Sequence, residues 1–541
     1  MASAPNEDLP RVYPHTWARL PEDARRRLMS LCVRPEDLPH QLSQLIQEYG
    51  QPEWLREMAE LEAALWECRR CGDGVERHPG SLCINPCLSV IQVRWKDLLE
   101  LLGTEEGVRV ASELHAFSEE EGTGLVWWDP SRGHVRLEPA RNEDLLVVKM
   151  VAEGIDARDL AAEHGLSTSR LYTLLQRVRK KGLLLGPASR LQRPPEVAPR
   201  DGALAEAHLE AEIFTLQWHL TDACDMHCRH CYGGGGARSH VDRETAFRVL
   251  RETAELCREK NVRGQITFTG GNPFLHPHFL EVYEAAVKEG FLVAILGNPA
   301  DEGTLDRLAA IEPPALFQVS LEGLREHNDF IRHQGHYDRV LGFLDRLGEY
   351  GISSRVMLTL TRANMDQVLP LGEELRGRTD GFTFNRISLV GEGAALHPPD
   401  PASYRAFLGE YLEAARKNPV LRLKDNMLNP VLAAQGAEPF GGCTGFGCGA
   451  AFNFMALLPD GEVHACRKFP SPIGDNTAET LTEIYDSRTA SAYRSAPEAC
   501  LACSLCSVCR GCPAVVHSFG GDVFRDRDPY CPGPIPSYRP G

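Results

Sequence analysis

The stretch IFTLQWHLTDACDMHCRHCY, residues 213–232, decides the fold. Its first part is a β-rich run, and the loop that follows has a C-x3-C-x2-C spacing that contributes Cys224, Cys228 and Cys231. Three thiolates in one loop can hold three corners of an iron–sulfur cubane, whose usual complement is four cysteines. One iron would then stay open for a ligand, as in open catalytic metal sites. The alternative is a zinc knuckle that uses His227 or His230 as the fourth ligand.

Downstream of this loop, the chain alternates between β-rich runs and helical stretches. Six β-rich runs lie between residues 213 and 391, and stretches such as RETAFRVLRETAELCREK separate them. Continuous apolar strands that alternate with helices predict a parallel α/β sheet covered on both faces. Six such units predict a partial (β/α)6 TIM-like barrel, with its functional residues at the C-terminal ends of the strands.

Length, charge and cysteine content narrow the class of protein. The chain has 541 residues, of which 43% are hydrophobic and 25% charged, as in a globular protein of several domains. A net charge of −17 offers nucleic acid or an anionic membrane no overall attraction. The sequence has no secretory signal pattern and no apolar run of membrane-spanning length, so we expect a cytoplasmic protein without a membrane partner. In a reducing compartment its 18 cysteines are expected to be metal ligands or catalytic groups more often than disulfides.

Composition divides the chain into six expected regions. The barrel is expected at 211–400. Before it come a helical N-terminal region, a winged-helix unit and a linker rich in Pro, Ala and charge, expected at 1–120, 121–187 and 188–210. After it come bridging helices and a cysteine-rich region, expected at 401–440 and 441–541. The cysteine-rich region holds nine thiols and few aliphatic runs, which predicts that bound metal holds it together.

The cysteine spacing of the first loop, followed by the aromatic Tyr232, resembles that of the radical S-adenosylmethionine (radical SAM) enzymes. In that family, three cysteines hold a [4Fe-4S] cluster whose open iron binds the amino and carboxylate groups of S-adenosylmethionine. Reductive cleavage of this cofactor yields a 5′-deoxyadenosyl radical that abstracts hydrogen from a substrate. The resemblance therefore implies a radical SAM barrel with S-adenosylmethionine as its cofactor.

The resemblance also implies cofactor contacts at the ends of the next strands, from Gly270, Gly271, Asn272, Asn298, Ser320 and Arg332. Asn272 stands where the family usually has Glu, which leaves a main-chain contact to the cofactor's amino group. The two glycines allow such a close approach of main chain to ligand. Asn298 matches a position that meets the ribose, Ser320 one that faces the cofactor, and Arg332 could pair with the carboxylate.

The C-terminal cysteines resemble the SPASM extension of radical SAM enzymes, which binds two auxiliary [4Fe-4S] clusters and would bring the total to three. The resemblance implies two ligand sets: Cys443, Cys448, Cys466 and Cys512 for the first cluster, and Cys500, Cys503, Cys509 and Cys531 for the second. The middle segment, C-x2-C-x5-C-x2-C, is one residue shorter than the family's pattern. Inside it, Cys506 is an extra thiol that could replace Cys503 or Cys509. Zinc ribbons are the alternative.

Residues 121–187 have the order of a winged-helix unit, a hairpin followed by three helices. The last of these, at 167–181, has five basic residues and no acidic one: Arg170, Arg177, Arg179, Lys180 and Lys181. The order resembles the peptide-recognition elements of ribosomal-peptide maturation enzymes, which bind a leader peptide as an added strand against the third helix. The alternatives are a purely structural unit and a DNA-binding helix-turn-helix. The acidic chain and the attached catalytic domain argue against DNA.

Six further cysteines lie outside these groups. Four of them form two close pairs that could bind zinc, the alternative being unliganded thiols: Cys68, Cys71, Cys83 and Cys87. Cys32 and Cys257 lie in apolar helical contexts and are expected to be packing residues.

The combination of regions is similar to that of peptide maturases, and segments such as 441–474 and 382–394 resemble the selenobiotic-type, or thio(seleno)oxazole-modification, radical SAM maturases. This resemblance implies hydrogen abstraction from a ribosomally made precursor peptide and oxidation at a Cys or selenocysteine. The auxiliary clusters would accept an electron, and a reductant such as flavodoxin or ferredoxin would serve the first cluster.

Three alternative functions stay open: a formylglycine-forming maturase, a thioether-forming maturase, and an iron–sulfur redox-sensing regulator that binds DNA. Arg467 stands where formylglycine-forming enzymes have an Asp, which counts against that activity. The sequence does not identify a general base. Glu322 and Glu392 are geometric candidates that we expect to be solvated carboxylates on the rim of the barrel.

Overall fold

The computed structural model describes residues 8–32, 34–72, 74–103, 119–198, 208–233 and 239–538. The chain divides into two compact units, Met1–Ala188 and Ser189–Gly541. Each unit has a sheet and a hydrophobic core of its own. In the described residues, no helix is both long enough and apolar enough to span a bilayer.

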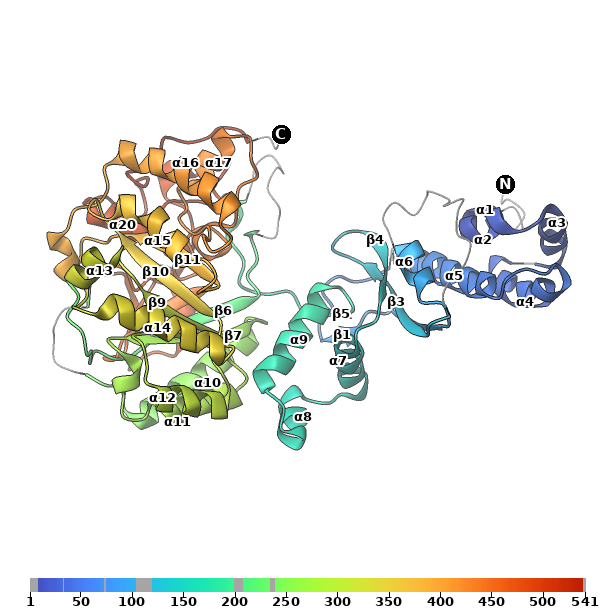
Figure 1. The fold of residues 1–541 in the computed structure, drawn as a ribbon, viewed down its shortest axis with the longest axis horizontal. Helices are drawn as coiled ribbons and strands as arrows, with labels where there is room; N and C mark the ends of the chain where they lie inside the picture. The colour runs from blue at the N-terminus through green and yellow to red at the C-terminus, as the bar shows by residue number, and fades with distance from the viewer. Residues whose placement is uncertain are drawn as a thin grey trace. The chain divides into compact units, whose positions relative to one another are not determined.

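The second unit is built on a nine-stranded sheet, with the order β11-β10-β9-β8-β7-β6-β12-β13-β14. Figure 1 labels the strands β6, β7, β9, β10 and β11 of this sheet. Its first six strands in the chain are β6 (Ile213–Thr221), β7 (Arg263–Gly270), β8 (Leu292–Leu296), β9 (Leu316–Ser320), β10 (Ser354–Leu360) and β11 (Gly381–Arg386). All the pairings among these six are parallel. The predicted α/β barrel of six parallel strands is therefore confirmed.

Helices connect the parallel strands: α10 (Arg243–Glu259), α11 (Phe279–Lys288), α12 (Glu302–Ile311), α13 (Arg325–Ile331), α14 (His336–Glu349) and α15 (Val368–Glu374). Aspartate side chains begin two of them, since Asp242 accepts a hydrogen bond from the backbone of Thr245 and Asp301 from that of Thr304. Such caps satisfy amide groups that have no partner within the helix.

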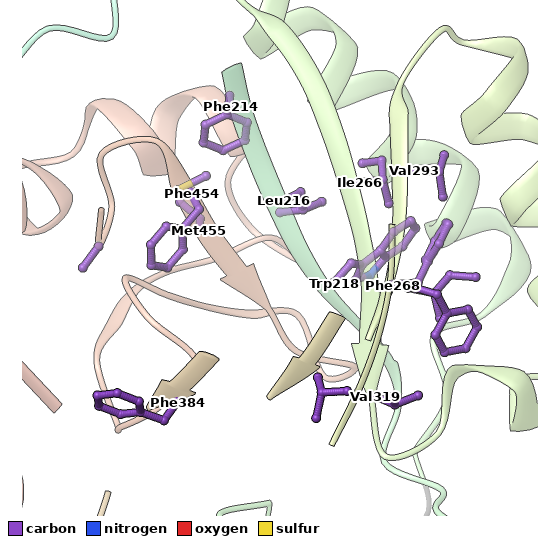
Figure 2. Close-up of a cluster of buried hydrophobic side chains, with 14 of the residues drawn as sticks. Phe214, Leu216, Trp218, Ile266, Phe268, Val293, Val319, Phe384, Phe454 and Met455 are labelled. Atoms are coloured by element: carbon purple, nitrogen blue, oxygen red, sulfur yellow. The ribbon is translucent and has the colours of Figure 1, made fainter. Parts of the chain in front are cut away.

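The core of the second unit lies between the sheet and these helices (Figure 2). On β6, Phe214, Leu216 and Trp218 are fully buried, and Trp218 stacks on Phe268 of β7 with ring centroids 6.0 Å apart. Because side chains alternate along a strand, the odd-numbered residues of β6, which include His219, face the opposite side of the sheet. That side is the interior of the barrel.

The cysteine-rich region extends the same sheet. Strand β12 (Phe454–Leu457) pairs in parallel with β6, and β13 (Glu462–His464) and β14 (Pro472–Asp475) follow in antiparallel order. Helices α16 (Pro401–Lys417) and α17 (Leu428–Ala434) precede them, and α18 (Leu481–Asp486), α19 (Arg488–Arg494) and α20 (Pro513–Ser518) come after. The cysteines are thereby attached to the strand that carries the C-x3-C-x2-C loop.

Part of the segment expected to be a linker packs on the second unit. Leu191 and Val197 are fully buried, and the guanidinium of Arg193 donates hydrogen bonds to carbonyl groups of the cysteine-rich region. Its Pro, Ala and charged residues suggested an extended connector. The structure shows instead that residues 189–198 pack on the second unit, whereas 199–207 lie outside the described residues.

The first unit begins with the helices α1 (Leu9–Val12), α2 (Pro14–Arg19), α3 (Glu22–Leu31), α4 (Leu38–Glu48), α5 (Trp54–Gly72) and α6 (Asp97–Gly103). A three-stranded antiparallel sheet follows the order β2 (Ser89–Val93), β3 (Gly122–Asp129) and β4 (His134–Pro139). The predicted hairpin is β3–β4, and the three predicted helices are α7 (Asn142–Glu153), α8 (Ala157–His164) and α9 (Thr168–Lys180).

The helical region and the winged-helix unit share this sheet. Val126 of β3 belongs to the core of the N-terminal helices, whereas Leu125 and Trp127 belong to the core formed with α7 and α9. The expected boundary at residue 120 therefore falls inside one compact unit, because the strand β2 comes from the region assigned to the helices.

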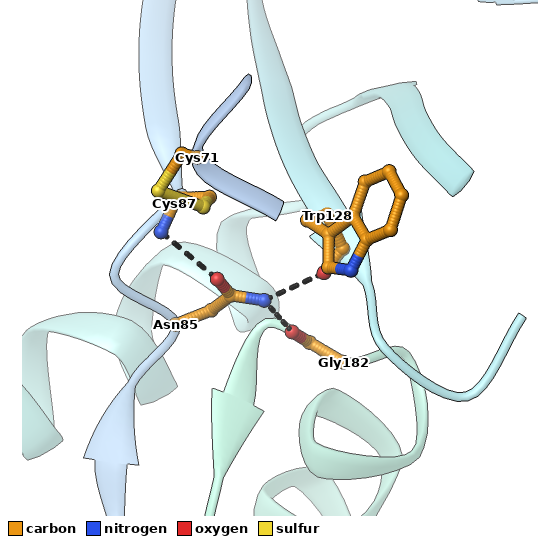
Figure 3. Close-up of a disulfide and its surroundings, with 5 residues drawn as sticks. All are labelled: Cys71, Asn85, Cys87, Trp128 and Gly182. Carbon is orange, nitrogen blue, oxygen red and sulfur yellow. Dashed lines mark hydrogen bonds between the residues drawn. A yellow bond between two sulfur atoms is a disulfide. The ribbon is translucent and has the colours of Figure 1, made fainter. Parts of the chain in front are cut away.

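The expectation for the four N-terminal cysteines was wrong for two of them, Cys71 and Cys87. Cys71 and Cys87 form a disulfide, and so they are neither zinc ligands nor unliganded thiols (Figure 3). Buried Asn85 orders the surrounding loop, since its amide donates hydrogen bonds to the carbonyls of Trp128 and Gly182 at 2.8 and 2.7 Å. Cys68 is buried among apolar side chains.

Candidate functional site

The C-x3-C-x2-C loop begins where β6 ends. Buried Thr221 fixes its start, because the Thr221 hydroxyl accepts a hydrogen bond from the backbone of Ala223 at 2.9 Å. The three thiols then lie close enough for their charges to interact pairwise: Cys224, Cys228 and Cys231. Burial raises the pKa of each thiol, so a bound metal would have to compensate the thiolate charges.

The two glycines at the end of β7 pack directly on this loop. A Cβ atom at Gly270, which has a φ of +120°, would lie 2.3 Å from the carbonyl oxygen of Thr221, and one at Gly271 would lie 2.2 Å from that of Ala223. Glycine is therefore required at both positions because the main chain at the end of β7 lies against the cysteine loop. The glycines hold the loop against the neighbouring strand end.

One carboxylate joins three strand ends. Asp225, which follows Cys224, accepts hydrogen bonds from the side-chain amides of Asn272 at 3.0 Å and Asn298 at 2.6 Å. The Asn298 amide also lies 3.8 Å from the sulfur of Cys224. The predicted residues Asn272 and Asn298 thus meet beside the first cysteine. Sequence reasoning missed Asp225, although its place directly after a cysteine was the available signal.

A second carboxylate, Glu322, organises the other side of the loop. Glu322 is 1% exposed, so the expectation of a solvated rim carboxylate was wrong. Its Oε1 accepts hydrogen bonds from Nε and Nη2 of Arg332 at 3.0 and 2.5 Å, and its Oε2 accepts one from the backbone of Thr359 at 2.7 Å. Burial raises the pKa of Glu322, but His230 and Arg332 lower it more, so the net pKa lies below its usual value. Glu392, in contrast, is exposed.

Arg332 is thereby aimed at the cysteine loop. Its Nη2 lies 3.4 Å from His230 Nε2, and its charge interacts with the thiols of Cys228 and Cys231. Burial lowers the pKa of His230 to about 4. Ser320, the last residue of β9, is half-buried and lies beside Met357 in the sheet register.

Tyr232 lies between the cysteine loop and the C-terminal region. Arg467, which follows Cys466, has its guanidinium 5.9 Å from the Tyr232 ring centre and donates a 3.3 Å hydrogen bond to Thr269 of β7. Thr269 pairs with His219 in the sheet register, so this arginine reaches the interior face of the barrel. Burial, together with Arg467, lowers the pKa of His219 to about 3. An arginine here cannot serve as a carboxylate base.

The predicted ligands of the first auxiliary cluster converge. Cys448 interacts electrostatically with Cys443 and Cys512, and Cys466 with Cys448 and Cys512. Backbone hydrogen bonds fix two of these residues, since the amide of Cys443 donates to Asn426 at 2.7 Å and that of Cys512 to Asp528 at 2.9 Å. Four thiols from distant parts of the sequence thus meet in one place.

The other five thiols line a single pocket: Cys500, Cys503, Cys506, Cys509 and Cys531. Sulfur atoms here take part in backbone hydrogen bonds, including one from Ile535 to Cys503 at 3.4 Å. The donor set and the pocket fit a four-cysteine cluster. The extra thiol Cys506 lines the same pocket as the four predicted ligands, so its position also allows it to be a ligand in place of Cys503 or Cys509.

A left-handed turn accommodates the short spacing between Cys509 and Cys512. The two residues between them, Arg510 and Gly511, have φ angles of +57° and +64°. Two successive left-handed residues reverse the chain within a very short span, an arrangement that glycine adopts easily. Cys509 can therefore join the five-thiol pocket while Cys512 joins the other group.

Among the described residues, no three His, Cys, Asp or Glu side chains converge as the ligands of a single metal ion do. A cubane does not require that arrangement, because each of its cysteines binds a different iron atom.

Two parts of the chain match models of known protein families. Residues 218–375 match the model of the Radical SAM superfamily, and residues 448–513 match the model of the SPASM iron–sulfur cluster-binding domain. These two parts of the chain therefore carry the sequence patterns of a radical SAM barrel and of a SPASM domain.

The chain is also similar to several curated proteins. It is 24% identical over 283 residues to AlbA, the antilisterial bacteriocin subtilosin biosynthesis protein of Bacillus subtilis, which covers 50% of this chain and 59% of AlbA. It is 27% identical over 270 residues to the mycofactocin maturase MftC of Mycolicibacterium smegmatis, covering 48% and 66%. It is also 22% identical over 359 residues to the AdoMet-dependent heme synthase of Methanosarcina barkeri, covering 60% and 97%. The matches thus span less than two thirds of AlbA and MftC.

Proposed function

We propose that this enzyme is a peptide maturase that removes a hydrogen atom from a residue of a ribosomally made precursor peptide and oxidises that residue. The observation that carries the proposal is the convergence at one sheet edge of the three-thiol loop, Asn298 and Arg332, with Cys466 of the first C-terminal group close to Tyr232. The likeness to AlbA and MftC, whose names place them in bacteriocin biosynthesis and mycofactocin maturation, supports a peptide as the substrate. A Cys or selenocysteine is the proposed target residue.

The proposed cofactor site uses the residues around the loop. Cys224, Cys228 and Cys231 would hold a [4Fe-4S] cluster, which with S-adenosylmethionine supplies a hydrogen-abstracting radical when both are bound. Arg332, held in place by Glu322, would bind the cofactor's carboxylate, because a guanidinium is a strong and directional carboxylate partner. Asn298 would meet the ribose, and the main chain at Gly271 and Asn272 the amino group. Ser320 and Tyr232 would complete the contact surface.

The C-terminal thiols would hold two auxiliary [4Fe-4S] clusters that take up the electron released on oxidation. Clusters fully coordinated by cysteine have no open iron, which suits electron transfer. A small electron carrier such as flavodoxin or ferredoxin would supply the electron needed for cofactor cleavage.

The winged-helix part of the first unit would bind the leader of the precursor peptide. In the described part of this unit, β4 forms its sheet hydrogen bonds with β3, so its other side is the edge at which a peptide strand could be added. The charges on the third helix argue against DNA, since Arg177 and Lys181 both form ion pairs with buried Asp144, at 3.0 and 2.8 Å. Side chains neutralised in this way are poor phosphate ligands.

The test is co-expression with candidate precursor peptides followed by mass spectrometry of the peptide. We expect the wild-type chain to form 5′-deoxyadenosine and to change the peptide mass, and the Cys224→Ala/Cys228→Ala/Cys231→Ala variant to do neither while staying folded. The matched control is Cys257→Ala, which changes a buried cysteine outside the three groups. A reconstituted wild-type protein that never cleaves S-adenosylmethionine but binds promoter DNA would contradict the proposal and favour the redox-sensing regulator.

A further inference from the structure

Two buried arginines, Arg193 and Arg510, lie side by side between the two groups of C-terminal thiols. They are 6% and 4% exposed, and both donate hydrogen bonds to the same two carbonyls, those of Phe446 and Cys448. The Nη2 atom of Arg193 lies 3.0 Å from Phe446 O, and that of Arg510 lies 2.7 Å from the same oxygen. Two positive charges are therefore buried next to each other.

No carboxylate neutralises either charge within the described residues. The remaining polar contact of Arg193 is with the carbonyl of Arg494 at 2.9 Å, and its guanidinium lies 3.7 Å from the ring centre of Phe452. Two donors are buried without an acceptor in this part of the chain, Nε of Arg193 and Nη1 of Arg510. Burying two like charges without a counter-charge is strongly unfavourable, so something negative must belong beside them.

Most of the acidic groups that interact electrostatically with the two arginines are cysteines. Arg510 interacts electrostatically with Cys448 of the first group and with Cys500, Cys506 and Cys509 of the pocket. Arg193 interacts with Cys448, Tyr485 and Cys506. A thiolate-ligated [4Fe-4S] cluster has a net negative charge spread over its sulfurs, and buried donors near it are natural partners for those sulfurs.

We propose that Arg193 and Arg510 are the counter-charges of the auxiliary clusters and raise their reduction potentials. This inference rests on the proposed function, because that proposal supplies the clusters. Positive charge beside a cluster stabilises the form that has gained an electron, and net charge and hydrogen bonds to sulfur are among the factors that set cluster potentials. The arginine pair would therefore make the auxiliary clusters better electron acceptors.

The experiment uses the full-length chain with Cys224, Cys228 and Cys231 replaced by Ala, so that the auxiliary signals are seen alone. After anaerobic reconstitution, iron and sulfide are measured, and the clusters are titrated with dithionite while electron paramagnetic resonance follows reduction. We expect Arg193→Gln to lower the reduction potential of at least one cluster, and Arg193→Lys, which keeps the charge, to restore most of it. Arg510→Gln repeats the test from the other arginine if Arg193→Gln does not fold.

The matched control is Arg494→Gln, because the Arg494 side chain also donates to carbonyls, those of Ala451 and Tyr485. Its potentials should equal those of the parent. Unchanged potentials in folded Arg193→Gln and Arg510→Gln would overturn the inference and leave the proposed function standing. If the parent shows no auxiliary [4Fe-4S] signal at all, the proposed electron acceptor fails, and this inference fails with it.

Discussion

Arg386, the last residue of β11, and Asp528, in the cysteine-rich region, form a bidentate ion pair with both N–O distances at 2.7 Å. Both residues are buried, and Arg386 also contacts Asp425 at 2.9 Å. Asp528 accepts in turn a hydrogen bond from the backbone of Cys512. The end of the last barrel strand is thus tied to a proposed cluster ligand.

We expect Asp528→Asn to destabilise the second unit strongly. Removing one partner of a buried ion pair typically costs about 3–5 kcal/mol, and Arg386 would keep only Asp425 of its two buried carboxylate partners. The urea midpoint of the second unit should therefore fall, and the iron content after reconstitution should fall with it as Cys512 loses its anchor. Asp526→Asn, in an exposed turn, is the control and should behave like the wild type. An unchanged midpoint in Asp528→Asn would show that the pair does not hold these regions together.

Glu322→Gln tests whether Arg332 is positioned for the cofactor. The substitution keeps the shape of the side chain but removes the charge that holds the guanidinium, so Arg332 should lose its orientation. We expect the Kd for S-adenosylmethionine, measured by calorimetry on the reconstituted enzyme, to rise roughly tenfold, or about 1.4 kcal/mol. Exposed Glu326 lies nearby on α13, and Glu326→Gln should bind the cofactor normally. Equal affinity in both variants would remove Arg332 from the cofactor site.

The Cys71–Cys87 disulfide predicts a response of the first unit to reductant. Closing a loop with a sequence separation of 16 residues restricts the unfolded chain, a stabilisation of about 3 kcal/mol in the chain-entropy model. Under oxidising conditions the first unit should melt at a higher temperature than with dithiothreitol, and Cys71→Ser should show no such difference. Peptide mapping without reductant should find the Cys71–Cys87 cross-link. Rapid alkylation of Cys71 in the native oxidised protein would contradict the pairing.

Sequence patterns predicted the parallel barrel because each of its strands is a continuous apolar run and the cysteine loop directly follows one of them. They did not predict which charged residues are buried. Glu322 looked like a rim carboxylate, since only the tertiary fold brings Arg332 and the backbone of Thr359 to it. Arg193 lies in a segment whose composition is that of a linker, and its partners are more than 250 residues away in the chain.

Spacing alone did not separate the C-terminal thiols into two groups, and the two ligand sets were expected only from the resemblance to the SPASM extension. Cys509 and Cys512 are only three positions apart, yet the left-handed turn at Arg510 and Gly511 directs them to different places. Positive φ at a non-glycine residue such as Arg510 has no clear sequence signature. The disulfide was missed for a related reason, because Cys71 and Cys87 meet only once α5 packs on the sheet that contains β3.

Acidification should weaken the second unit through His336. This histidine is 1% exposed and its Nδ1 accepts a hydrogen bond from Asn328, while burial and the charges of Arg332 and Arg339 lower its pKa to about 3. Because the pKa of an unfolded histidine is about 6.5, the unfolded state binds a proton between these values that the folded state does not, and stability falls as pH decreases. From pH 7.5 to pH 5 this one residue should cost roughly 2 kcal/mol, measured from urea unfolding. His336→Asn should lose less stability over that range. A substitution of exposed His333 should leave the pH dependence of stability unaltered. A loss in His336→Asn equal to that of the wild type would contradict the assignment of this pH dependence to His336.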